Sequence, residues 1–557
     1  MCETKRFESR RVATALFFLA LVLVGCEGDG SGGSSPTIEF SNSSECIRFD
    51  GSFPSDLALL PGADGEAAVV QLLPIAILGL DLDREPPRLL ARDGIPGFPE
   101  VPCGDCSCGV CGDSENVGID SDSDGDVDAC RNYALGFGCD SPVPGELLVM
   151  DARRVALSTT NIEQIVFIDP RTNLLLPVEL ETPAASPSFE PADWPFWPPP
   201  NTRPVRTALS TRTCVYGEGL VGSLGSPIGN RASCDGVRNG FSTRFTAGAA
   251  SVRGHIFAAT SNFLILGRGF PSQFAPGTVL VFDYDATISP PRARPNPNRP
   301  VIQLTGYNPT GVTAYQTPNG RDLILVNVTG AIVTGTGTDL VRTDSSIDVI
   351  DAESLELIAT IPLGRAGLGF SGLAIDPSRR LALAGAATSR ALFGIDLAAL
   401  DDPALGLDPE SRPVVLDGSD ANFPDARVFS ATTPFRLPKR TDGAPESVCA
   451  TQTSVSLSVD ADWGVTSDFC DGTVSLLGLR LPASRTTPLD PEAILRVERV
   501  QKVAFPLVAE SFDRTRAIDR ILIRPGRPGI DFSGPDVYFS AGLEVGAVCG
   551  THINALD

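Results

Sequence analysis

Five aspartates between positions 120 and 128 form the sharpest chemical pattern in the chain. One residue separates each aspartate from the next, and Gly125 is one of these separating residues: Asp120, Asp122, Asp124, Asp126 and Asp128. Carboxylate oxygens are the ligands that hard cations such as Ca²⁺ prefer, and a glycine permits the sharp turn that wraps them around an ion. The alternative is a solvated acidic loop, but unpaired carboxylates this close repel one another. The pattern therefore predicts a structural calcium site.

The segment resembles the thrombospondin type-3 calcium repeat, D-x-D-x-D-G-x-x-D-A-C. Four aspartates and one cysteine match it residue by residue: Asp120, Asp122, Asp124, Asp128 and Cys130. Arg131 departs from the pattern, because that repeat usually carries another aspartate there. The resemblance implies a bound Ca²⁺, and the departure implies a modest affinity.

Cysteines cluster around this segment. Six of the 14 cysteines lie within residues 100–140: Cys103, Cys106, Cys108, Cys111, Cys130 and Cys139. Their spacing would suggest zinc in a cytosolic protein, whereas in an exported one it favours disulfides. We therefore expect residues 100–140 to be an insertion held by calcium and disulfides, with too few apolar residues for a core of its own. Three further disulfide pairs are expected elsewhere: Cys214 with Cys234, Cys449 with Cys470, and Cys46 with Cys549.

The N-terminus has the pattern of a bacterial export signal. Four basic residues precede an apolar run at 12–24, which is too short to span a bilayer. The run ends in Leu23-Val-Gly-Cys26, which resembles the lipoprotein box and implies lipidation of Cys26; an ordinary signal peptide with a chance cysteine is the alternative. We expect a signal peptide at 1–25 and a flexible tether at 26–36. In enterobacteria the residue after the lipidated cysteine helps to sort lipoproteins between membranes. By resemblance to that rule, Glu27 favours attachment to the outer membrane, on its periplasmic or its surface face.

The charge of the chain restricts its partners. The formal net charge is −24, and no basic stretch offers the electrostatic footprint that nucleic-acid binding requires. An acidic protein gains nothing from an anionic membrane surface, so attachment is expected only through the lipid. The expected partner is an envelope protein or a small ligand.

Catalytic patterns are poorly supported. The chain has two histidines, His255 and His552, which excludes a histidine-rich metal site. It contains no G-x-S-x-G motif, P-loop or dinucleotide fingerprint. No catalytic or cofactor-binding residue is assigned. Acids lining a central channel remain the one catalytic alternative.

Short apolar runs between turn residues provide the framework that would position these groups. Residues 343–385 contain four such runs, at 347–351, 355–361, 373–375 and 381–384. Four short antiparallel strands in about forty residues are typical of one β-propeller blade. Residues 347–351 alternate as a half-buried strand does.

This stretch resembles the YVTN-type bacterial β-propeller repeat. The resemblance is carried by Ile-Asp-Val-Ile-Asp at 347–351, Ile-Pro-Leu-Gly at 361–364 and Gly-Leu-Ala-Ile-Asp-Pro at 372–377. It implies an architecture and no catalytic residues.

A division of the whole chain predicts an all-β fold, a single propeller at 37–557 with about seven blades, six or eight being alternatives. The predicted units are 55–90, 146–180, 249–304, 310–364, 372–416, 428–500 and 503–548. The proline-rich residues 182–213 are expected to form a covering loop or a polyproline segment. Strands near the two chain ends should share a sheet and close the ring. Two β domains divided near residue 200 are the competing arrangement.

Together these features predict a cell-envelope lipoprotein that acts as a ligand-binding or protein-interaction scaffold, with a structural calcium ion. The alternative is a propeller enzyme, either a lactonase-like hydrolase or a quinoprotein-type oxidoreductase. The chain has three tryptophans, which argues against the quinoprotein case, because those families place tryptophans in each blade.

Overall fold

A computed structural model provides the structure of the chain. The residues that it describes are 37–38, 46–49, 52–61, 66–73, 76–82, 88–90, 117–119, 129–131, 144–159, 163–172, 174–214, 242–265, 271–330, 332–333, 341–364, 373–385, 391–397, 400, 435–436, 452–457, 463–468, 473–479, 495–503, 518–523, 537–541 and 546–551.

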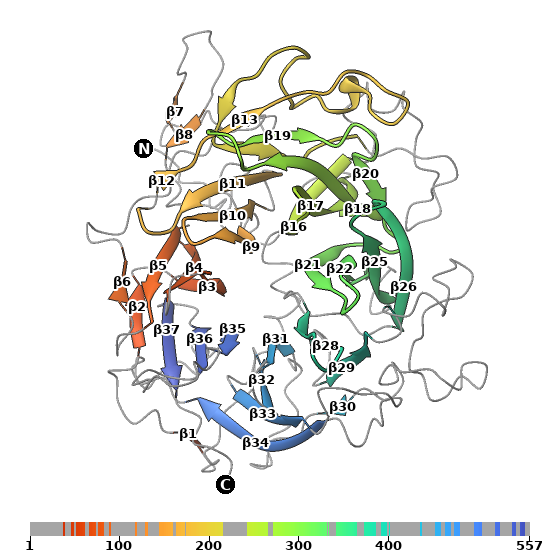
Figure 1. Cartoon of the computed structure of the whole chain (residues 1–557). Helices are drawn as coiled ribbons and strands as arrows, with labels where there is room; N and C mark the ends of the chain where they lie inside the picture. Colours follow the sequence, from red (N-terminus) through yellow and green to blue (C-terminus); the bar gives the residue numbers. More distant parts are fainter. Residues whose placement is uncertain are drawn as a thin grey trace, which may run out of the picture.

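The described strands form seven sheets of four or more strands, arranged as a ring of blades (Figure 1). Blade 1 contains β3 (Ser52–Leu59), β4 (Glu66–Leu73), β5 (Ala76–Asp81) and β6 (Arg88–Leu89). Blade 2 contains β9 (Pro144–Asp151), β10 (Arg154–Thr159), β11 (Gln164–Asp169), β12 (Leu174–Leu175) and β15 (Ala208–Ser210). Blade 3 contains β16 (Ser242–Val252), β17 (His255–Ile265), β18 (Pro271–Asp285), β19 (Arg292–Pro295) and β20 (Val301–Gln303), extended by β13 (Val178–Leu180) and β14 (Val205–Arg206).

The second half of the ring has the same plan. Blade 4 contains β21 (Pro309–Gln316), β22 (Asp322–Val328), β25 (Ser345–Asp351) and β26 (Glu356–Gly364). Blade 5 contains β27 (Ala374–Asp376), β28 (Leu381–Gly385), β29 (Ala391–Asp396) and β30 (Phe435–Arg436). Blade 6 contains β31 (Gln452–Leu457), β32 (Trp463–Asp468), β33 (Thr473–Leu479), β34 (Leu495–Val503) and β1 (Thr37–Ile38). Blade 7 contains β35 (Ile518–Ile523), β36 (Val537–Ala541), β37 (Gly546–Thr551) and β2 (Cys46–Phe49). The all-β propeller is therefore confirmed, and so is the count of seven.

The two ends of the chain close the ring, as predicted. The N-terminal strand β2 is the outer strand of blade 7 and pairs antiparallel with β37, with Cys46 directly opposite Cys549. The strand β1 adds to the outer edge of blade 6 by pairing in parallel with β34. Two segments from the start of the chain therefore complete the last two blades.

The division of residues 343–385 into one blade is wrong. Strands β25 and β26 are the outer half of blade 4, whereas β27 and β28 are the inner half of blade 5. Each of the four predicted runs does contain a strand. Between Gly364 and Leu373, however, the chain passes from the outermost strand of blade 4 to the innermost strand of blade 5. The division at 310–364 and 372–416 has the correct boundary.

The expectation that residues 347–351 are half-buried is also wrong. All seven residues of β25 are buried, including the polar Ser346 and Asp348. In a propeller both faces of a blade pack against neighbouring blades, so an inner or middle strand has no solvent face. Polar residues in such a strand must find hydrogen-bond partners inside the protein.

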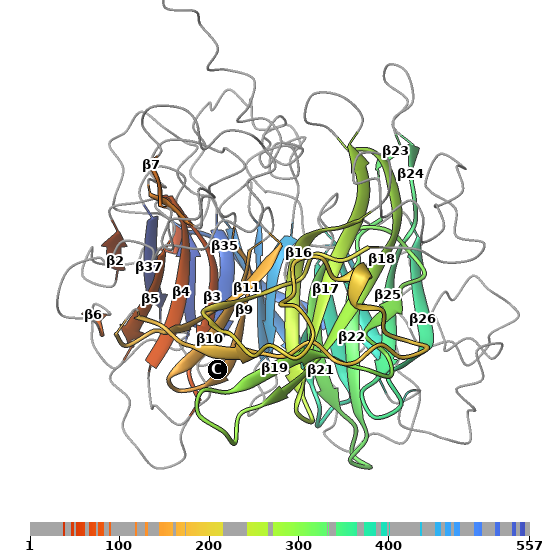
Figure 2. The same cartoon turned by 90° about the horizontal axis from the view of Figure 1, so that it is seen from above.

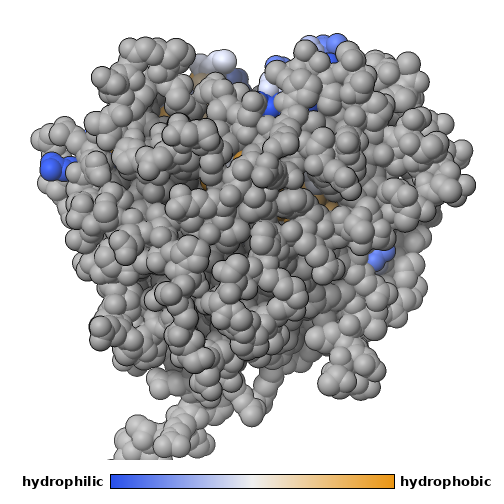
Figure 3. Space-filling model, turned by 90° about the horizontal axis from the view of Figure 1, so that it is seen from below, coloured by the Kyte–Doolittle hydropathy of each residue, from blue (hydrophilic) through white to orange (hydrophobic). Residues whose placement is uncertain are grey.

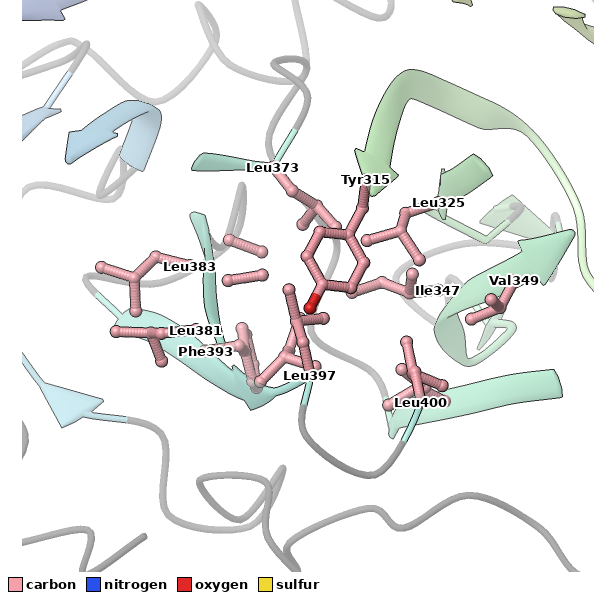
Figure 4. Close-up of a cluster of buried hydrophobic side chains, with 14 of the residues drawn as sticks. Tyr315, Leu325, Ile347, Val349, Leu373, Leu381, Leu383, Phe393, Leu397 and Leu400 are labelled. Carbon is pink, nitrogen blue, oxygen red and sulfur yellow. The ribbon is translucent and has the colours of Figure 1, made fainter. Parts of the chain in front are cut away.

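The hydrophobic core is divided into layers between successive blades. One cluster fills the space between blades 4 and 5, where Tyr315, Leu325 and Ile347 meet Leu373 and Phe393 (Figure 4). Similar clusters lie between blades 1 and 2, 2 and 3, and 3 and 4. Blades 2, 3 and 4 are thus held by burial of apolar surface on both of their faces.

The proline-rich residues 182–213 belong to the covering segment that was predicted; this segment, residues 178–214, is here called the strap. The strap includes β13, β14 and a short 3-10 turn, η2 (Pro191–Asp193), and it returns to blade 2 as β15. Its aromatic residues Trp194 and Trp197 are buried in the layer between blades 2 and 3. Trp197 stacks on Phe282 with ring centroids 5.5 Å apart and donates from Nε1 to the Ser210 carbonyl at 3.0 Å.

The strap also excludes two separate domains divided near residue 200. Strand β13 follows blade 2 along the chain but pairs in parallel with β19 of blade 3, with Leu180 opposite Ala293. The innermost strands β9 and β16 lie side by side in the ring. The boundary region is therefore a joint between adjacent blades.

The two faces of the ring differ in their connections (Figure 2). One face carries the connections between first and second and between third and fourth strands, and we call it the short-turn face, because in blades 2 to 4 these connections are short: 151–154, 169–174, 252–255, 285–292, 316–322 and 351–356. Blade 5 is an exception, because β29 and β30 are joined on this face through residues 397–434. The opposite face is called the insertion face, because the connections leaving it include residues 91–143 and 329–344. Two small ribbons belong to these connections, one of β7 (Val117–Ile119) and β8 (Ala129–Arg131), the other of β23 (Ile332–Val333) and β24 (Val341–Arg342).

Candidate functional site

The predicted calcium residues Asp120, Asp122, Asp124, Asp126 and Asp128 lie outside the described residues, but the strands on either side of them are described. β7 and β8 pair antiparallel, with Val117 opposite Arg131 and Ile119 opposite Ala129. The aspartate segment 120–128 therefore connects the two strands of a hairpin, and its ends are held side by side. Within the described ranges, no three His, Cys, Asp or Glu side chains gather closely enough to hold a metal ion.

The disulfide candidates are placed only in part. Cys46 and Cys549 are register partners between β2 and β37. Cys130 lies in β8 opposite Gly118, and Cys214 ends the strap, where its N–H donates to the Asp193 carbonyl at 3.0 Å. Cys26, Cys103, Cys106, Cys108, Cys111, Cys139, Cys234, Cys449 and Cys470 lie outside the described residues.

At the centre of the ring, acids on the innermost strands bind the backbone of neighbouring blades. Asp56 of β3 is 2% exposed, and its Oδ2 accepts the N–H of Leu147 in β9 at 2.7 Å. Its Oδ1 accepts the N–H of Leu57 at 2.7 Å. The Oδ2 atom therefore joins blade 1 to blade 2, and the Oδ1 atom accepts a hydrogen bond within its own strand.

Glu146 makes a longer connection of the same kind. Its Oε2 accepts the N–H of Val312 in β21 at 3.3 Å, which joins blade 2 to blade 4. The side chain passes over β16 of blade 3 at Gly248, where a Cβ would lie 2.4 Å from Glu146 Oε2. A side chain at position 248 would therefore displace the Glu146 carboxylate from this position. On the far side of blade 4, Thr313 Oγ1 accepts the N–H of Leu373 at 2.9 Å and continues the series into blade 5.

The short-turn face contains a repeated arginine–aspartate pairing that was not predicted from the sequence. In blades 2 and 4 an aspartate ends the third strand and accepts a hydrogen bond from the arginine that immediately precedes the second strand. In blade 2 the Arg153 NH2 group lies 2.8 Å from Asp169 Oδ2, and in blade 4 Arg321 binds Asp351. Each aspartate also accepts a backbone N–H of the following turn, such as Arg171 at 2.9 Å and Glu353 at 2.9 Å.

Blade 3 has a histidine in the corresponding place. His255 Nδ1 lies 3.1 Å from Asp283 Oδ1, and Asp283 also accepts from Asn296 and Arg294. Burial opposes ionisation of this carboxyl, but the interactions with His255, Asn296 and Arg294 outweigh it and lower the pKa of Asp283. His255 therefore has a structural role at this turn, while His552 lies outside the described residues.

A buried carboxyl, Asp348, joins blades 3 and 4 near the rim. It accepts the N–H and the hydroxyl of Thr305, each at 2.7 Å. Burial raises the pKa of Asp348, and these hydrogen bonds compensate only in part. The folded chain therefore binds this proton more tightly than the unfolded chain, and ionisation of Asp348 costs stability as the pH rises above the ordinary value of 3.8.

We expect Asp348→Asn to become more stable relative to the unsubstituted chain as the pH rises from 4 to 8, because asparagine does not ionise and still reaches both groups of Thr305. Unfolding by denaturant across this range measures the difference. The control is Asp285→Asn: hydrogen bonds from the Thr287 hydroxyl and N–H lower the pKa of the exposed Asp285, so this variant should lose relative stability over the same range. A relative loss with rising pH in Asp348→Asn would contradict the assignment.

Sequence comparisons assign no family. No family model matches the chain, and no curated protein sequence matches it. Among solved structures, the β-propeller domain of Myceliophteria thermophila Cps50 (Swd1) is similar at 10% identity, covering 91% of this chain and 99% of that one, with a TM-score of 0.39. The Dos1 propeller has 8% identity, coverage of 94% and 96%, and a TM-score of 0.39. Kuenenia stuttgartiensis hydrazine synthase has 11% identity, coverage of 74% and 97%, and a TM-score of 0.34.

These similarities concern the fold, which the seven sheets of the chain establish independently. The propeller part of the resemblance noted in residues 343–385 is confirmed, and its YVTN type stays a prediction. Among the described residues, no helix has the length and apolar composition needed to cross a bilayer. On the side seen in Figure 3, the described residues that protrude are hydrophilic, and hydrophobic ones are visible only in recesses.

Proposed function

We propose that the chain is a lipid-anchored protein of the bacterial cell envelope whose propeller is an interaction scaffold, with the insertion face as its binding surface. The observation that carries the proposal is the place of the longest connection: residues 91–143 and the connection 329–344 leave the insertion face, whereas in blades 2 to 4 the described turns of the other face are short and internally paired. Binding residues are found preferentially on loops that a rigid scaffold positions.

The alternative of a propeller enzyme requires central acids that are available for chemistry. The two acids described here, Asp56 and Glu146, both accept backbone N–H groups of neighbouring blades. This favours a structural role for them. The use of these two carboxylates in contacts between blades supports a binding function for the propeller over a catalytic one.

Site-specific photocrosslinking in cells tests the scaffold proposal. A photoreactive phenylalanine is placed at Asp344 on the insertion face or at Asn319 on the short-turn face, and both residues are exposed. We expect a discrete adduct with an envelope protein from position 344 and none from position 319. Adducts from Asn319 alone, or from no position, would contradict the proposal. The second outcome, in which no position gives an adduct, would indicate a scaffold that binds a small ligand.

Anchoring through Cys26 predicts the behaviour of one variant. Cys26→Ser removes the only proposed site of lipid attachment, so we expect the protein to move from the membrane pellet to the soluble envelope fraction. Fractionation followed by detection of the protein measures this. The proposal of a lipid anchor is wrong if the serine variant stays in the pellet under conditions that release peripheral proteins.

Calcium binding by the aspartate segment predicts a local change in protease sensitivity. We expect Ca²⁺ to protect residues 100–140 of the unsubstituted protein, and Asp122→Ala with Asp124→Ala to abolish this effect while the ring stays folded. The matched control is Asp105→Ala with Asp113→Ala, which removes two carboxylates of the same insertion outside the alternating series. Equal cleavage of the unsubstituted protein with and without Ca²⁺ would show that no such site exists.

A further inference from the structure

The three longest strands of blade 3 change their pairing register at one level near the insertion face. β16, β17 and β18 contain 11, 11 and 15 residues and extend further on that side than the strands of blade 2 (Figure 2). The shifts lie on both sides of β17: two in β16, within 244–248, and one in β18, between the partners of Thr260 and Asn262. Bulges leave a residue unpaired and redirect nearby side chains. The polar groups at this level are therefore arranged differently from those of a regular blade.

Neutral polar side chains occupy this level in the seam between blades 2 and 3. The hydroxyl oxygens of Thr260 in β17 and Thr278 in β18 lie 2.8 Å apart. Thr246 in β16 shares a hydrogen bond with Thr211, which follows β15 at the end of the strap. All four threonines are at most 1% exposed. Together with Asn262 we call them the polar band, which crosses from the strap to the third strand of blade 3.

The side chain of Asn262 is fully buried, but only its amino group has a partner in the described part of the chain. Nδ2 donates to the Pro276 carbonyl at 2.6 Å and to the Thr278 hydroxyl at 3.4 Å. No described residue donates to Oδ1, which is also buried. Exchanging the two amide atoms would place the oxygen against the Pro276 carbonyl, which already accepts from Gln303 at 3.0 Å. The oxygen is therefore the atom that needs a donor.

The chemistry of the seam restricts what this donor is. A buried amide oxygen without a donor loses the hydrogen bonds that water gives it in the unfolded chain, so such groups are rarely left alone. The donor must be small, because Oδ1 is buried. It must also be neutral, because the chain has no acidic residue between Asp235 and Asp283 that could compensate a buried cation. A water molecule meets both requirements, and the hydroxyls of the polar band supply its other polar contacts.

We propose that Asn262 Oδ1 accepts a hydrogen bond from a buried structural water that belongs to the polar band. The water joins β17 to the hydroxyls of Thr246 and Thr211, and so continues the connection between the strap and blade 3. Because the band lies near the insertion-face ends of β16, β17 and β18, the site fixes the base of the strands that extend on this face. The proposal goes beyond the proposed function and depends neither on the lipid anchor nor on calcium.

A crystal structure of the full-length protein tests the site directly. We expect an ordered solvent peak about 2.5 to 3.0 Å from Asn262 Oδ1, with a second contact to a threonine hydroxyl of the polar band. A protein group that donates to Oδ1 overturns the proposal, and so does a seam without a solvent peak. Crystals grown in a rubidium salt distinguish a cation, because an anomalous rubidium peak beside Oδ1 would show a monovalent ion in place of water.

A pair of variants tests whether Asn262 is the residue that holds the water. Asn262→Leu removes the acceptor at similar volume, so we expect the solvent peak to disappear. The matched control is Asn296→Leu: Asn296 is 6% exposed, and its Oδ1 accepts the N–H groups of Asn298 at 3.0 Å and Arg299 at 2.8 Å. This variant should keep the peak beside Asn262. A peak that persists in Asn262→Leu overturns the assignment, and the unsubstituted protein decides the proposal even where the leucine variant does not fold.

Discussion

The double variant Cys46→Ser, Cys549→Ser is expected to lose about 5 kcal/mol of unfolding free energy under oxidising conditions, because it would remove the predicted disulfide between the two ends of the chain. The two cysteines are directly opposite each other in the pairing of β2 with β37. Opposite Cα atoms in an antiparallel ladder lie about 4.5 to 5.5 Å apart, which is within the range that a disulfide requires. The bond would enclose nearly the whole fold, and long loops gain most from a covalent closure, although only logarithmically.

Formation of this bond removes two protons and two electrons from the thiols, so it requires an external acceptor such as a thiol–disulfide oxidant of the cell envelope. Denaturant unfolding of the oxidised protein measures the effect, and mass spectrometry of unreduced peptides identifies the linkage. The control is the reduced protein, in which the double variant and the unsubstituted chain should have similar stability. Linkage of Cys46 to a cysteine other than Cys549 would refute the pairing, as would equal stability of the two oxidised proteins.

The ring architecture could be predicted because each blade is built from local strands and turns. Five of the predicted units, from 55–90 to 372–416, begin near the first strand of a blade, although 428–500 and 503–548 begin well before β31 and β35. The pairing of the chain ends also followed from a general requirement, since an open ring leaves unpaired edges. The assignment of residues 343–385 to one blade was wrong, because the sequence of four consecutive strands looks the same whether they belong to one blade or to two neighbouring blades.

The contacts at the centre of the ring could not be predicted in the same way. Glu146 and Val312 are 166 positions apart, and Asp56 and Leu147 are 91 apart, so they meet only after the ring has formed. The paired charges of the short-turn face had a weak local signal. Asp169 and Asp351 each follow an isoleucine at a strand end, but their arginine partners lie 16 and 30 residues earlier, with no fixed spacing.

The strap provides the second large effect: Trp197→Ala is expected to lower the unfolding free energy by about 3 to 5 kcal/mol, the usual cost of removing a buried tryptophan side chain. Trp197 is 6% exposed and packs in the layer between blades 2 and 3, against Phe282 and close to Trp194. Its truncation would open a cavity there and leave the Ser210 carbonyl without the indole N–H. We expect the increase in local protease sensitivity to be greatest in the part of the strap that crosses the outer edge of the ring.

Circular dichroism in denaturant measures the overall loss, and limited proteolysis measures release of the strap between residues 183 and 203. The matched control is Trp197→Phe, which keeps an aromatic ring on Phe282 and loses only the hydrogen bond and part of the volume. We expect it to fall between the alanine variant and the unsubstituted chain, with little added cleavage. If Trp197→Ala unfolds within about 1 kcal/mol of the unsubstituted chain, the strap contributes little to the joint between blades 2 and 3. In that case the apolar layer of Phe167, Leu180 and Phe282 holds the joint by itself.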